Sequence, residues 1–359
     1  MNKIAIIGAG ISGLSMANYL EKYNIDYHIY ERRKKDDLAG HGFLLPQEGI
    51  EYLSHIVDEN TLFKEGNFLK KYIHYSHTGR VISERKLENV FVISRRSLIN
   101  ILSHNIPSDK ISYEKTITFC DTKKGKLKYP DGSYINSDIV VVSDGSKSRI
   151  RKEIFKNEVM NSVRDNEVVN IIENKEIADR IENNFMKFHH EDGGLTFGIL
   201  KLSDAKVLWY SQFDSLKYQI NEDCSVENLK RYTQKIFADW HPLVSSIVNG
   251  SSYENIHLWR VYELEKLNKF HQDNIVFIGD AAHPLIPFTS QGVTSALKDA
   301  FILTKLLLEE KNPEEVFRKY EEERKPEIEF HIKNGRTLLE QFLLPLDQQK
   351  ENILPISYK

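Results

Sequence analysis

A glycine-rich turn between an apolar strand and a helix most limits how this chain can fold. The turn, Gly8-Ala9-Gly10-Ile11-Ser12-Gly13, follows the apolar run Ile4–Ile7. Apolar residues at helical spacing predict a helix over residues 11–23, and a second strand is predicted over residues 26–30. A strand–helix–strand opening of this kind predicts a parallel, doubly wound α/β sheet.

The same turn is suited to holding a diphosphate. Gly8 permits the tight turn, Gly10 lets a pyrophosphate approach the backbone, and Gly13 lets helix and strand pack closely. The free N–H groups at the helix start, at Ile11 and Ser12, would hold the phosphates at the positive end of the helix dipole. The alternative is a glycine turn with a purely structural role.

Charged residues follow the second predicted strand. Glu31 lies 18 positions after Gly13 and is placed to accept hydrogen bonds from ribose hydroxyls. Arg32 and Arg33 would contact the adenine side of a dinucleotide or an incoming nicotinamide phosphate, or are simply surface charges.

A second ligand-binding pattern lies near the other end of the chain, after the predicted strand 274–278. It reads Gly279-Asp280-Ala281-Ala282-His283-Pro284. An Asp at the carboxyl end of a buried parallel strand lies in the crevice where open α/β sheets bind ligands, and its carboxylate can accept hydrogen bonds from a ribityl chain. The alternative is an N-cap for the following helix.

A long helix opens at Gln291-Gly292-Val293. Its N–H groups would face the pyrimidine edge of a flavin, where negative charge accumulates on reduction, and the helix dipole would stabilise that charge. Together with the aspartate, this favours a flavin over a nicotinamide as the resident cofactor.

These motifs resemble those of class A FAD-dependent monooxygenases of the para-hydroxybenzoate hydroxylase type, over nearly the whole chain. The compact layout is similar to that of the tetracycline-inactivating members. In sequence order the matching motifs are Gly8-x-Gly10-x-x-Gly13 with Glu31-Arg32, Arg95-x-x-Leu98-x-x-x-Leu102, Asp138-Ile-Val-Val-Val-Ser-Asp144-Gly145-x-x-Ser148-x-Ile150-Arg151, and Gly279-Asp280-Ala281-Ala282-His283-Pro284-x-x-Pro287.

The resemblance implies roles for the matching residues. Asp280 would bind the ribityl chain, Pro287 and Gln291–Val293 would lie at the flavin ring, and Arg95 would approach the FAD. Asp144 belongs to the motif implicated in both FAD and NAD(P)H binding, and His283 has a mainly structural role. The chain departs from the family pattern at Val142-Ser143, at Ser290 and at Thr294, where the family usually has Gly-Ala, Gly and Asn.

The resemblance also implies an enzyme activity. NAD(P)H would reduce FAD, and the reduced flavin would react with dioxygen to give a C4a-hydroperoxide. The distal oxygen would pass to an aromatic, phenolic or polycyclic small molecule. One alternative is an FAD-dependent dehydrogenase or reductase without oxygen insertion, and another is a binding protein that retains FAD for structure. A flavin halogenase lacks support because its Trp-x-Trp-x-Ile-Pro signature is absent.

The pattern of strands and helices predicts two domains. A mainly antiparallel β domain for substrate binding is inserted into a Rossmann-like FAD-binding domain, which ends with a charged C-terminal helix around residues 314–324. The predicted ranges are 1–66, 93–156 and 263–345 for the FAD-binding domain, 67–92 and 157–262 for the substrate domain, and 346–359 for a tail.

Substrate contacts are predicted from one strand of the inserted domain and from Phe288. Alternation places Trp209 and Tyr210 on opposite faces of the strand, with Gln212 on the face of Tyr210. One face should line a pocket against the flavin, although aromatic residues at such positions also serve as plain core. His41, in a glycine-containing segment, would touch flavin or substrate or face solvent.

Composition narrows the remaining classes. With 40% hydrophobic and 28% charged residues, the 359-residue chain is typical of soluble globular proteins. A net charge of −3 gives no electrostatic case for nucleic acid or an anionic membrane. No secretory signal or apolar run of about 18 residues is present, so a cytoplasmic monomer or homodimer is expected. Cys120, Cys224 and the pair His189-His190 lack metal-ligand spacing, so no metal site is expected.

Overall fold

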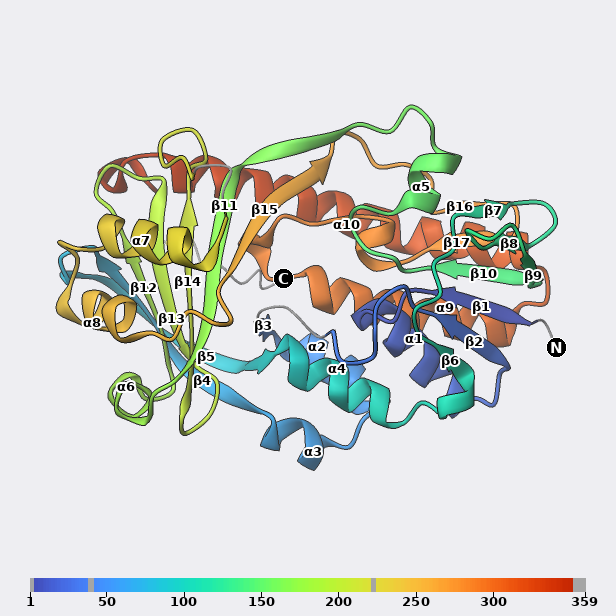
Figure 1. Cartoon of the computed structure of the whole chain (residues 1–359), viewed down its shortest axis with the longest axis horizontal. Helices are drawn as coiled ribbons and strands as arrows, with labels where there is room; N and C mark the ends of the chain where they lie inside the picture. Colours follow the sequence, from blue (N-terminus) through green and yellow to red (C-terminus); the bar gives the residue numbers. More distant parts are fainter. Residues whose placement is uncertain (1–2, 38–41, 221–223, 351–359) are drawn as a thin grey trace.

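The computed structural model describes residues 3–37, 42–220 and 224–350. His41 and most of the predicted tail (351–359) lie outside these ranges. Two large sheets form the two lobes of the molecule, and helix α10 (Pro313–Leu343) runs along both of them (Figure 1).

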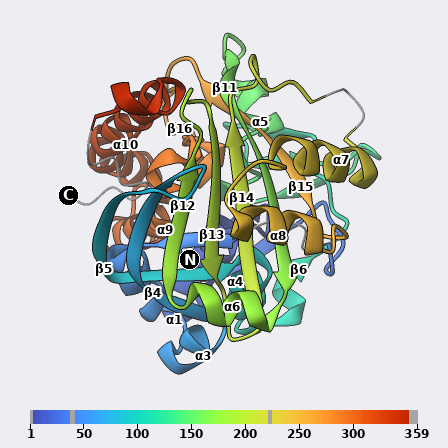
Figure 2. The same ribbon diagram turned by 90° about the vertical axis from the view of Figure 1, so that its left-hand side faces the viewer.

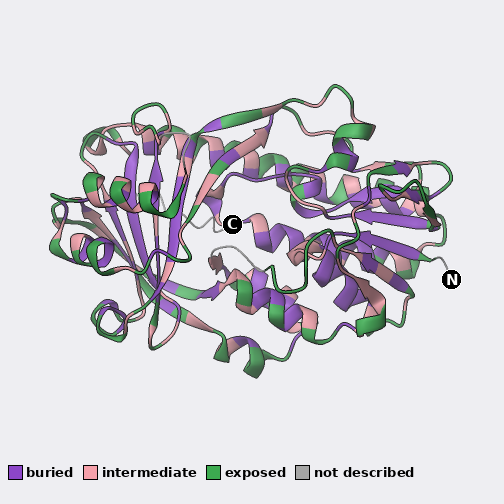
Figure 3. Ribbon diagram, in the orientation of Figure 1, coloured by how far each residue is buried: buried purple, intermediate pink, exposed green. Residues whose placement is uncertain are grey.

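The first lobe contains a six-stranded sheet. Five neighbouring strands are parallel and an antiparallel strand forms one edge. In spatial order the strands are β16 (His271–Gln272), β17 (Ile275–Phe277), β10 (Ile139–Val142), β1 (Ile4–Ile7), β2 (Tyr27–Tyr30) and β6 (Ile111–Ser112). The central strands β1, β10 and β17 are fully buried, as their continuous apolar sequences require (Figure 3). The predicted doubly wound α/β fold is confirmed.

Ten helices are described in residues 3–37, 42–220 and 224–350. Besides α10 they are α1 (Ile11–Lys22), α2 (Gln47–Ser54), α3 (Glu59–Lys64), α4 (Arg95–His104), α5 (Arg149–Ile154), α6 (Lys175–Ile181), α7 (Val226–Ile236), α8 (Pro242–Gly250) and α9 (Gly292–Glu309). Helices α1, α4 and α9 share one hydrophobic cluster with the strands of the first sheet. None of the helices in the described part of the chain is long and apolar enough to cross a membrane.

The second lobe contains an eight-stranded, mainly antiparallel sheet, as expected for the inserted domain. In spatial order its strands are β15 (His257–Leu264), β11 (Met160–Glu173), β14 (Lys206–Phe213), β13 (Leu195–Lys201), β12 (Asn184–His189), β4 (Gly66–Ser76), β5 (Val81–Ser94) and β3 (Gly42–Leu45). Only the β12–β4 pair is parallel among the strand pairs described for this sheet. Helices α6, α7 and α8 cover its outer face (Figure 2).

Two details of the sequence prediction differ from the structure. Strand β3 belongs to the eight-stranded sheet, although residues 42–45 lie in a range predicted for the FAD-binding domain. The sequence pattern over residues 226–240 predicts a helix that reaches Trp240, but α7 ends at Ile236 and Trp240 packs into the hydrophobic cluster on the outer face of the sheet. The turn residues Pro130-Asp131-Gly132-Ser133 predict a hairpin over residues 126–135, which is present as β8 (Lys126–Lys128) and β9 (Tyr134–Asn136), with β7 (Phe119–Asp121) beside them.

Helix α10 is longer than its charged sequence predicts. It continues through Pro326, which removes one backbone hydrogen bond, because buried residues on either side hold it against both lobes. At its far end the Phe342 carbonyl accepts a hydrogen bond from the Gly194 N–H at 2.7 Å. Arg336 donates to Glu263 at 2.9 Å. The helix therefore fixes the eight-stranded sheet relative to the first lobe.

Candidate functional site

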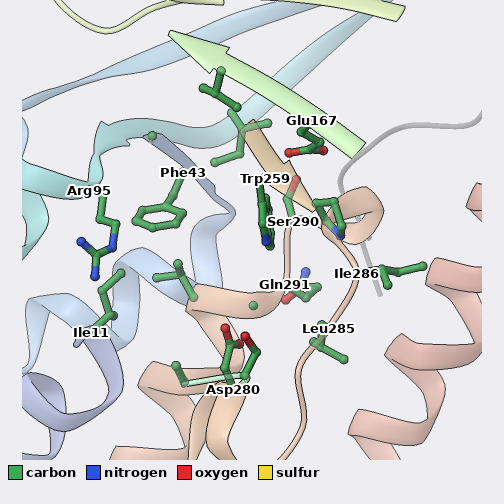
Figure 4. A pocket seen from close by; sticks show the side chains of 18 of the residues that line it. Ile11, Phe43, Arg95, Glu167, Trp259, Asp280, Leu285, Ile286, Ser290 and Gln291 are labelled. Atoms are coloured by element: carbon green, nitrogen blue, oxygen red, sulfur yellow. The ribbon is translucent and has the colours of Figure 1, made fainter. Parts of the chain in front are cut away.

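A cavity of about 520 Å³ lies between the two lobes. It receives residues from the glycine turn, from the chain after β10, from the inner face of the eight-stranded sheet and from the segment between β17 and α9 (Figure 4). The site-forming residues used below are Gly10, Ile11, Ser12, Arg95, Ser143, Gly145, Glu167, Tyr210, Gln212, Trp259, Asp280, Pro287, Phe288, Ser290, Gln291, Gly292 and Val293.

The glycine turn is tied to the end of β10 by Ser143. Its hydroxyl donates to the carbonyl oxygens of Ile7 at 2.9 Å and of Gly8 at 3.1 Å. Gly8 has φ +104°, and a Cβ there would lie 2.6 Å from the Ser143 carbonyl oxygen. A Cβ at Gly13 would lie 2.0 Å from the Gly8 carbonyl oxygen, so both glycines are required by packing. The departure from the family pattern at Ser143 thus has a structural role.

Arg151 joins the chain after β10 to the segment that carries Asp280. Its Nη1 donates to the carbonyl oxygens of Asp280 at 3.1 Å and Ala281 at 2.8 Å. The guanidinium is 1% exposed and pairs with Glu158 at 2.6 Å, which offsets the cost of burying its charge.

A buried acid on α9 holds the beginning of the Gly279–Pro284 segment. One carboxylate oxygen of Asp299 accepts hydrogen bonds from the Gly279 N–H and from His283 Nε2, both at 2.7 Å. The other accepts from Arg324 Nε of α10 at 2.7 Å. Burial opposes the charge on Asp299, but interactions with His283 and Arg324 outweigh it and lower the pKa of Asp299 to about 2. The structural role expected for His283 matches this geometry.

Two of the described helices begin at the cavity without a cap from the side chain of their N-cap residue. In the described part of the chain, no side chain caps α1 at Gly10 or α9 at Gln291. By contrast, α4 and α7 are capped by Ser94 and Ser225. A Cβ at Gly10 would meet nothing within 4 Å, so this glycine leaves open space beside the α1 N-terminus. The two helix ends and this space fit an anionic, dinucleotide-sized ligand.

Glu31 holds the glycine turn through hydrogen bonds to the backbone. Its two carboxylate oxygens accept hydrogen bonds from the N–H groups of Ala9 at 2.6 Å and Arg33 at 2.8 Å. A carboxylate has further acceptor capacity, so these bonds are compatible with the predicted ribose contact.

Asp280 projects into the cavity and faces Arg95 at the start of α4 (Figure 4). It is not a helix N-cap, because α9 is preceded by Gln291 and the short 3-10 turn η2 (Gly279–Ala281) by Ile278. The recessed position of Asp280 within the cavity raises its pKa by partial desolvation, while His283, Arg151 and Arg95 oppose the rise. Its side chain remains accessible from the cavity, so a ligand hydroxyl can reach it.

Ser290 adopts a left-handed backbone conformation, φ +53° and ψ 26°, at the end of the 3-10 turn η3 (Pro287–Thr289). A non-glycine residue rarely adopts this conformation, and the family's glycine would adopt it freely. The departure at Ser290 therefore keeps the turn and adds a hydroxyl-bearing side chain to the cavity wall.

The inner face of the eight-stranded sheet supplies Tyr210 and Gln212 to the cavity, as predicted. The prediction of substrate contact for Trp209 is wrong. Trp209 is fully buried on the opposite face, stacks on Phe197 at 5.2 Å and donates a hydrogen bond to Ser251 at 3.0 Å. Strand alternation sends neighbouring side chains to opposite faces, and helices α6–α8 cover the face of Trp209.

Some of the other predicted site residues line the cavity, and some lie outside its wall. Pro287, Phe288, Gln291, Gly292 and Val293 line the cavity. The described residues that line the cavity do not include Gly8, Gly13, Glu31, Arg32 or Asp144. Arg32 is exposed, and the Asp144 carboxyl is turned toward Ser148, whose hydroxyl opposes the rise in pKa that burial of Asp144 causes.

The sequence patterns did not predict roles for Asp299, Arg324 and Glu167. Asp299 carried a usable signal, because it lies on the same helical stripe as Ala296, Ala300 and Leu303. A lone acid on an apolar helix face indicates a buried ion pair. Arg324 and Glu167 carried no comparable local signal.

Comparison with known proteins agrees with this arrangement. A family model described as "FAD binding domain" matches residues 1–334. The 6-hydroxynicotinate 3-monooxygenase of Pseudomonas fluorescens is 24% identical, over 86% of this chain and 83% of the relative. The FAD-dependent urate hydroxylase of Klebsiella pneumoniae is 23% identical, over 90% of this chain and 85% of the relative.

Solved structures share the fold. Klebsiella pneumoniae HpxO complexed with FAD and uric acid superposes with a TM-score of 0.88 at 19% identity, covering 97% of this chain and 90% of that one. The tetracycline destructase Tet(51) superposes with a TM-score of 0.75 at 19% identity, covering 96% and 92%. The family match over almost the whole length, with the converging glycine turn, Asp280 segment and α9 N-terminus, shows that this chain belongs to the FAD binding domain family.

Proposed function

We propose that this protein is an FAD-dependent monooxygenase that uses NAD(P)H and dioxygen to hydroxylate an aromatic, phenolic or polycyclic small molecule. One observation carries the proposal: a single cavity joins two uncapped helix N-termini and Asp280 to an apolar and aromatic sheet face. When bound, FAD supplies the redox chemistry and the activation of dioxygen.

The first lobe would hold the cofactor. The N–H groups of Ile11 and Ser12, at the positive end of α1, would bind the diphosphate in the space beside Gly10. Asp280 would accept hydrogen bonds from the ribityl hydroxyls. The N–H groups at the start of α9, around Gly292, would stabilise negative charge on the flavin ring.

The second lobe would position the substrate. Its apolar wall excludes water from the reacting centre and binds a flat ring by burial of apolar surface. The wall residues on the inner sheet face are Val92, Val169, Leu200, Leu208 and Tyr210, with Trp259 from β15. The substrates in the names of the two relatives, 6-hydroxynicotinate and urate, support a ring-shaped substrate.

Isotope labelling tests the proposal. Purified protein loaded with FAD should oxidise NADH or NADPH faster when an accepted aromatic compound is added, and ¹⁸O from labelled dioxygen should appear in the product. Stimulated oxidation without label in the product would instead indicate a dehydrogenase or reductase.

The Asp280→Ala variant tests the cofactor site independently of activity. It should fold but lose bound FAD, because the carboxylate facing the ribityl position is gone. Asp204→Ala is a matched control, since the Asp204 side chain is 97% exposed on the far lobe. Retention of the yellow flavin spectrum by Asp280→Ala would contradict the assigned role.

A further inference from the structure

An acidic side chain, Glu167, lies in the mainly apolar and aromatic sheet wall of the cavity. Glu167 of β11 lines the cavity, is only 7% exposed, and lies across the cavity from Asp280 (Figure 4). We propose that Glu167 recognises the substrate by accepting a hydrogen bond from a ring N–H, amino or hydroxyl group. The protein would then select aromatic substrates that carry a donor on the edge facing the eight-stranded sheet. This inference rests on the proposed function.

A hydrogen-bonded chain along the inner sheet face fixes the Glu167 carboxylate. Lys187 Nζ donates to Gln212 Oε1 at 2.7 Å, and Gln212 Nε2 donates to Glu167 Oε1 at 2.8 Å. Because the lysine can only donate, it determines the orientation of the Gln212 amide and directs the amide N–H₂ toward Glu167. Among the described residues, Gln212 is the hydrogen-bond donor to the Glu167 carboxylate, and it bonds Oε1. The second oxygen, Oε2, therefore keeps its acceptor capacity for a ligand.

The groups around Glu167 make it easier to ionise than Asp165, the nearest acid on the same strand. Asp165, on the same strand face, is fully buried, and neither of its oxygens has a hydrogen-bond partner in the described part of the chain. Burial and the charge of Glu167 raise the pKa of Asp165 well above its usual range. Burial also raises the pKa of Glu167, but Lys187 and the hydrogen bond from Gln212 oppose that rise. Of these two acids, Glu167 is therefore the one that ionises first as pH rises.

The other titratable groups near the Glu167 carboxylate do not replace Lys187 as its cationic partner. Asp214, just after β14, is paired with Arg164, and Tyr210 on β14 is a neutral phenol because burial raises its pKa. On β15, burial lowers the pKa of His257, which keeps its imidazole neutral near pH 7. The hydrogen-bonded chain Glu167–Gln212–Lys187 is thus a polar group of residues in a wall whose other residues are mainly apolar or aromatic.

A buried acceptor of this kind discriminates strongly between ligands. A ligand without a donor would leave the Glu167 carboxylate desolvated and unpaired, which costs more than the loss of an ordinary contact. Sites built to bind a polar group therefore reject analogues that lack it more effectively than apolar pockets reject a size difference.

Indole and benzofuran are suitable probes, because the two bicyclic rings have nearly the same shape and differ in one N–H donor. Dissociation constants are measured with the FAD-loaded protein from ligand-induced changes in the flavin absorption spectrum. The wild type should bind indole at least about tenfold more tightly than benzofuran. Glu167→Leu should reduce this preference to less than about threefold, and Glu167→Gln, which keeps the shape, should reduce it partially.

Asp165→Asn is the matched control, since it changes a neighbouring acid on the same strand that does not line the cavity. It should keep the wild-type preference. In the wild type the preference for indole should also weaken as pH falls through the raised pKa of Glu167, because a protonated carboxyl is a poorer acceptor. Glu167→Gln should lack this pH dependence.

The outcomes separate the two proposals. If wild type and variants bind FAD normally but show no difference in preference, the role of Glu167 is overturned and the proposed function stands. If the wild type cannot be loaded with FAD, the proposed function fails and this inference fails with it.

Discussion

Ser12 of the glycine turn and Gly279 at the end of β17 are in direct contact, although they lie near opposite ends of the chain. A Cβ at position 279 would lie 2.0 Å from Ser12 Oγ, and Gly279 has φ +55°. The first and last cofactor motifs are therefore packed against each other without room for a methyl group. Hydrogen bonds from Ser143 and Arg151 connect both motifs to the segment after β10.

Gly279→Ala should destabilise the protein by about 1–3 kcal/mol, because the left-handed backbone and the contact with Ser12 both disfavour a Cβ. The measurement is the free energy of unfolding in urea without added FAD. Gly250→Ala is the control, since a Cβ there meets nothing within 4 Å and the residue is exposed. Equal stabilities of the two variants would show that the Ser12 contact is easily relieved.

Gly10→Val should leave folding intact but weaken FAD binding by at least about tenfold. Gly10 has φ −79° and ψ −174°, which a valine adopts readily, and a Cβ there would meet nothing within 4 Å among the described residues. Thermal unfolding of the FAD-free protein and a fluorescence titration with FAD measure the two effects separately. Gly8→Ala provides the contrast, because it should lower the stability of the FAD-free protein. Unchanged FAD affinity in Gly10→Val would argue against a diphosphate at this turn.

Asp299→Asn should cost about 3–5 kcal/mol of stability at pH 7, because it leaves the buried Arg324 without its counter-charge. The pKa of Asp299 is lowered from 3.8 to about 2 in the folded state. Its stabilising effect is therefore complete above about pH 4 and is lost as pH falls toward 2. Urea unfolding of wild type and variant at several pH values should show their difference shrinking in that window. A difference that does not depend on pH would contradict the ion-pair explanation.

Trp209→Phe and Tyr210→Phe should have different effects, because the two side chains lie on opposite faces of β14. The first should lower stability by about 1–3 kcal/mol and leave the affinity for aromatic probes unchanged. The second should change probe affinity, measured by flavin absorption, with a smaller effect on unfolding. A loss of probe affinity in Trp209→Phe without loss of stability would instead indicate that Trp209 contacts the substrate.

Local sequence was sufficient to predict the elements that surround the cofactor site. Strands β1 and β10 are continuous apolar runs, and the residues at Gly8–Gly13 and Gly279–Asp280 have backbone requirements that few other residues meet. These signals lie within short segments, so they can be read without knowing the fold. The family match confirms the FAD prediction made from them.

Long-range packing decided what the local pattern left open. The period of two along β14 placed Trp209 and Tyr210 on opposite faces, but only the packing of α6–α8 determined which face is covered. Helix α10 passes Pro326 because contacts with both lobes compensate for the missing hydrogen bond.

The sequence by itself determined the nucleotide-binding fold and the glycine turn and Asp280 segment that line its cavity, because these depend on glycine conformations and strand ends encoded locally. Only the tertiary structure decided how Ser12, Asp299 and Arg324 hold those segments together, and that Glu167 faces the cavity. The partners in these contacts come from distant segments, and their pairing depends on how the sheets and helices pack.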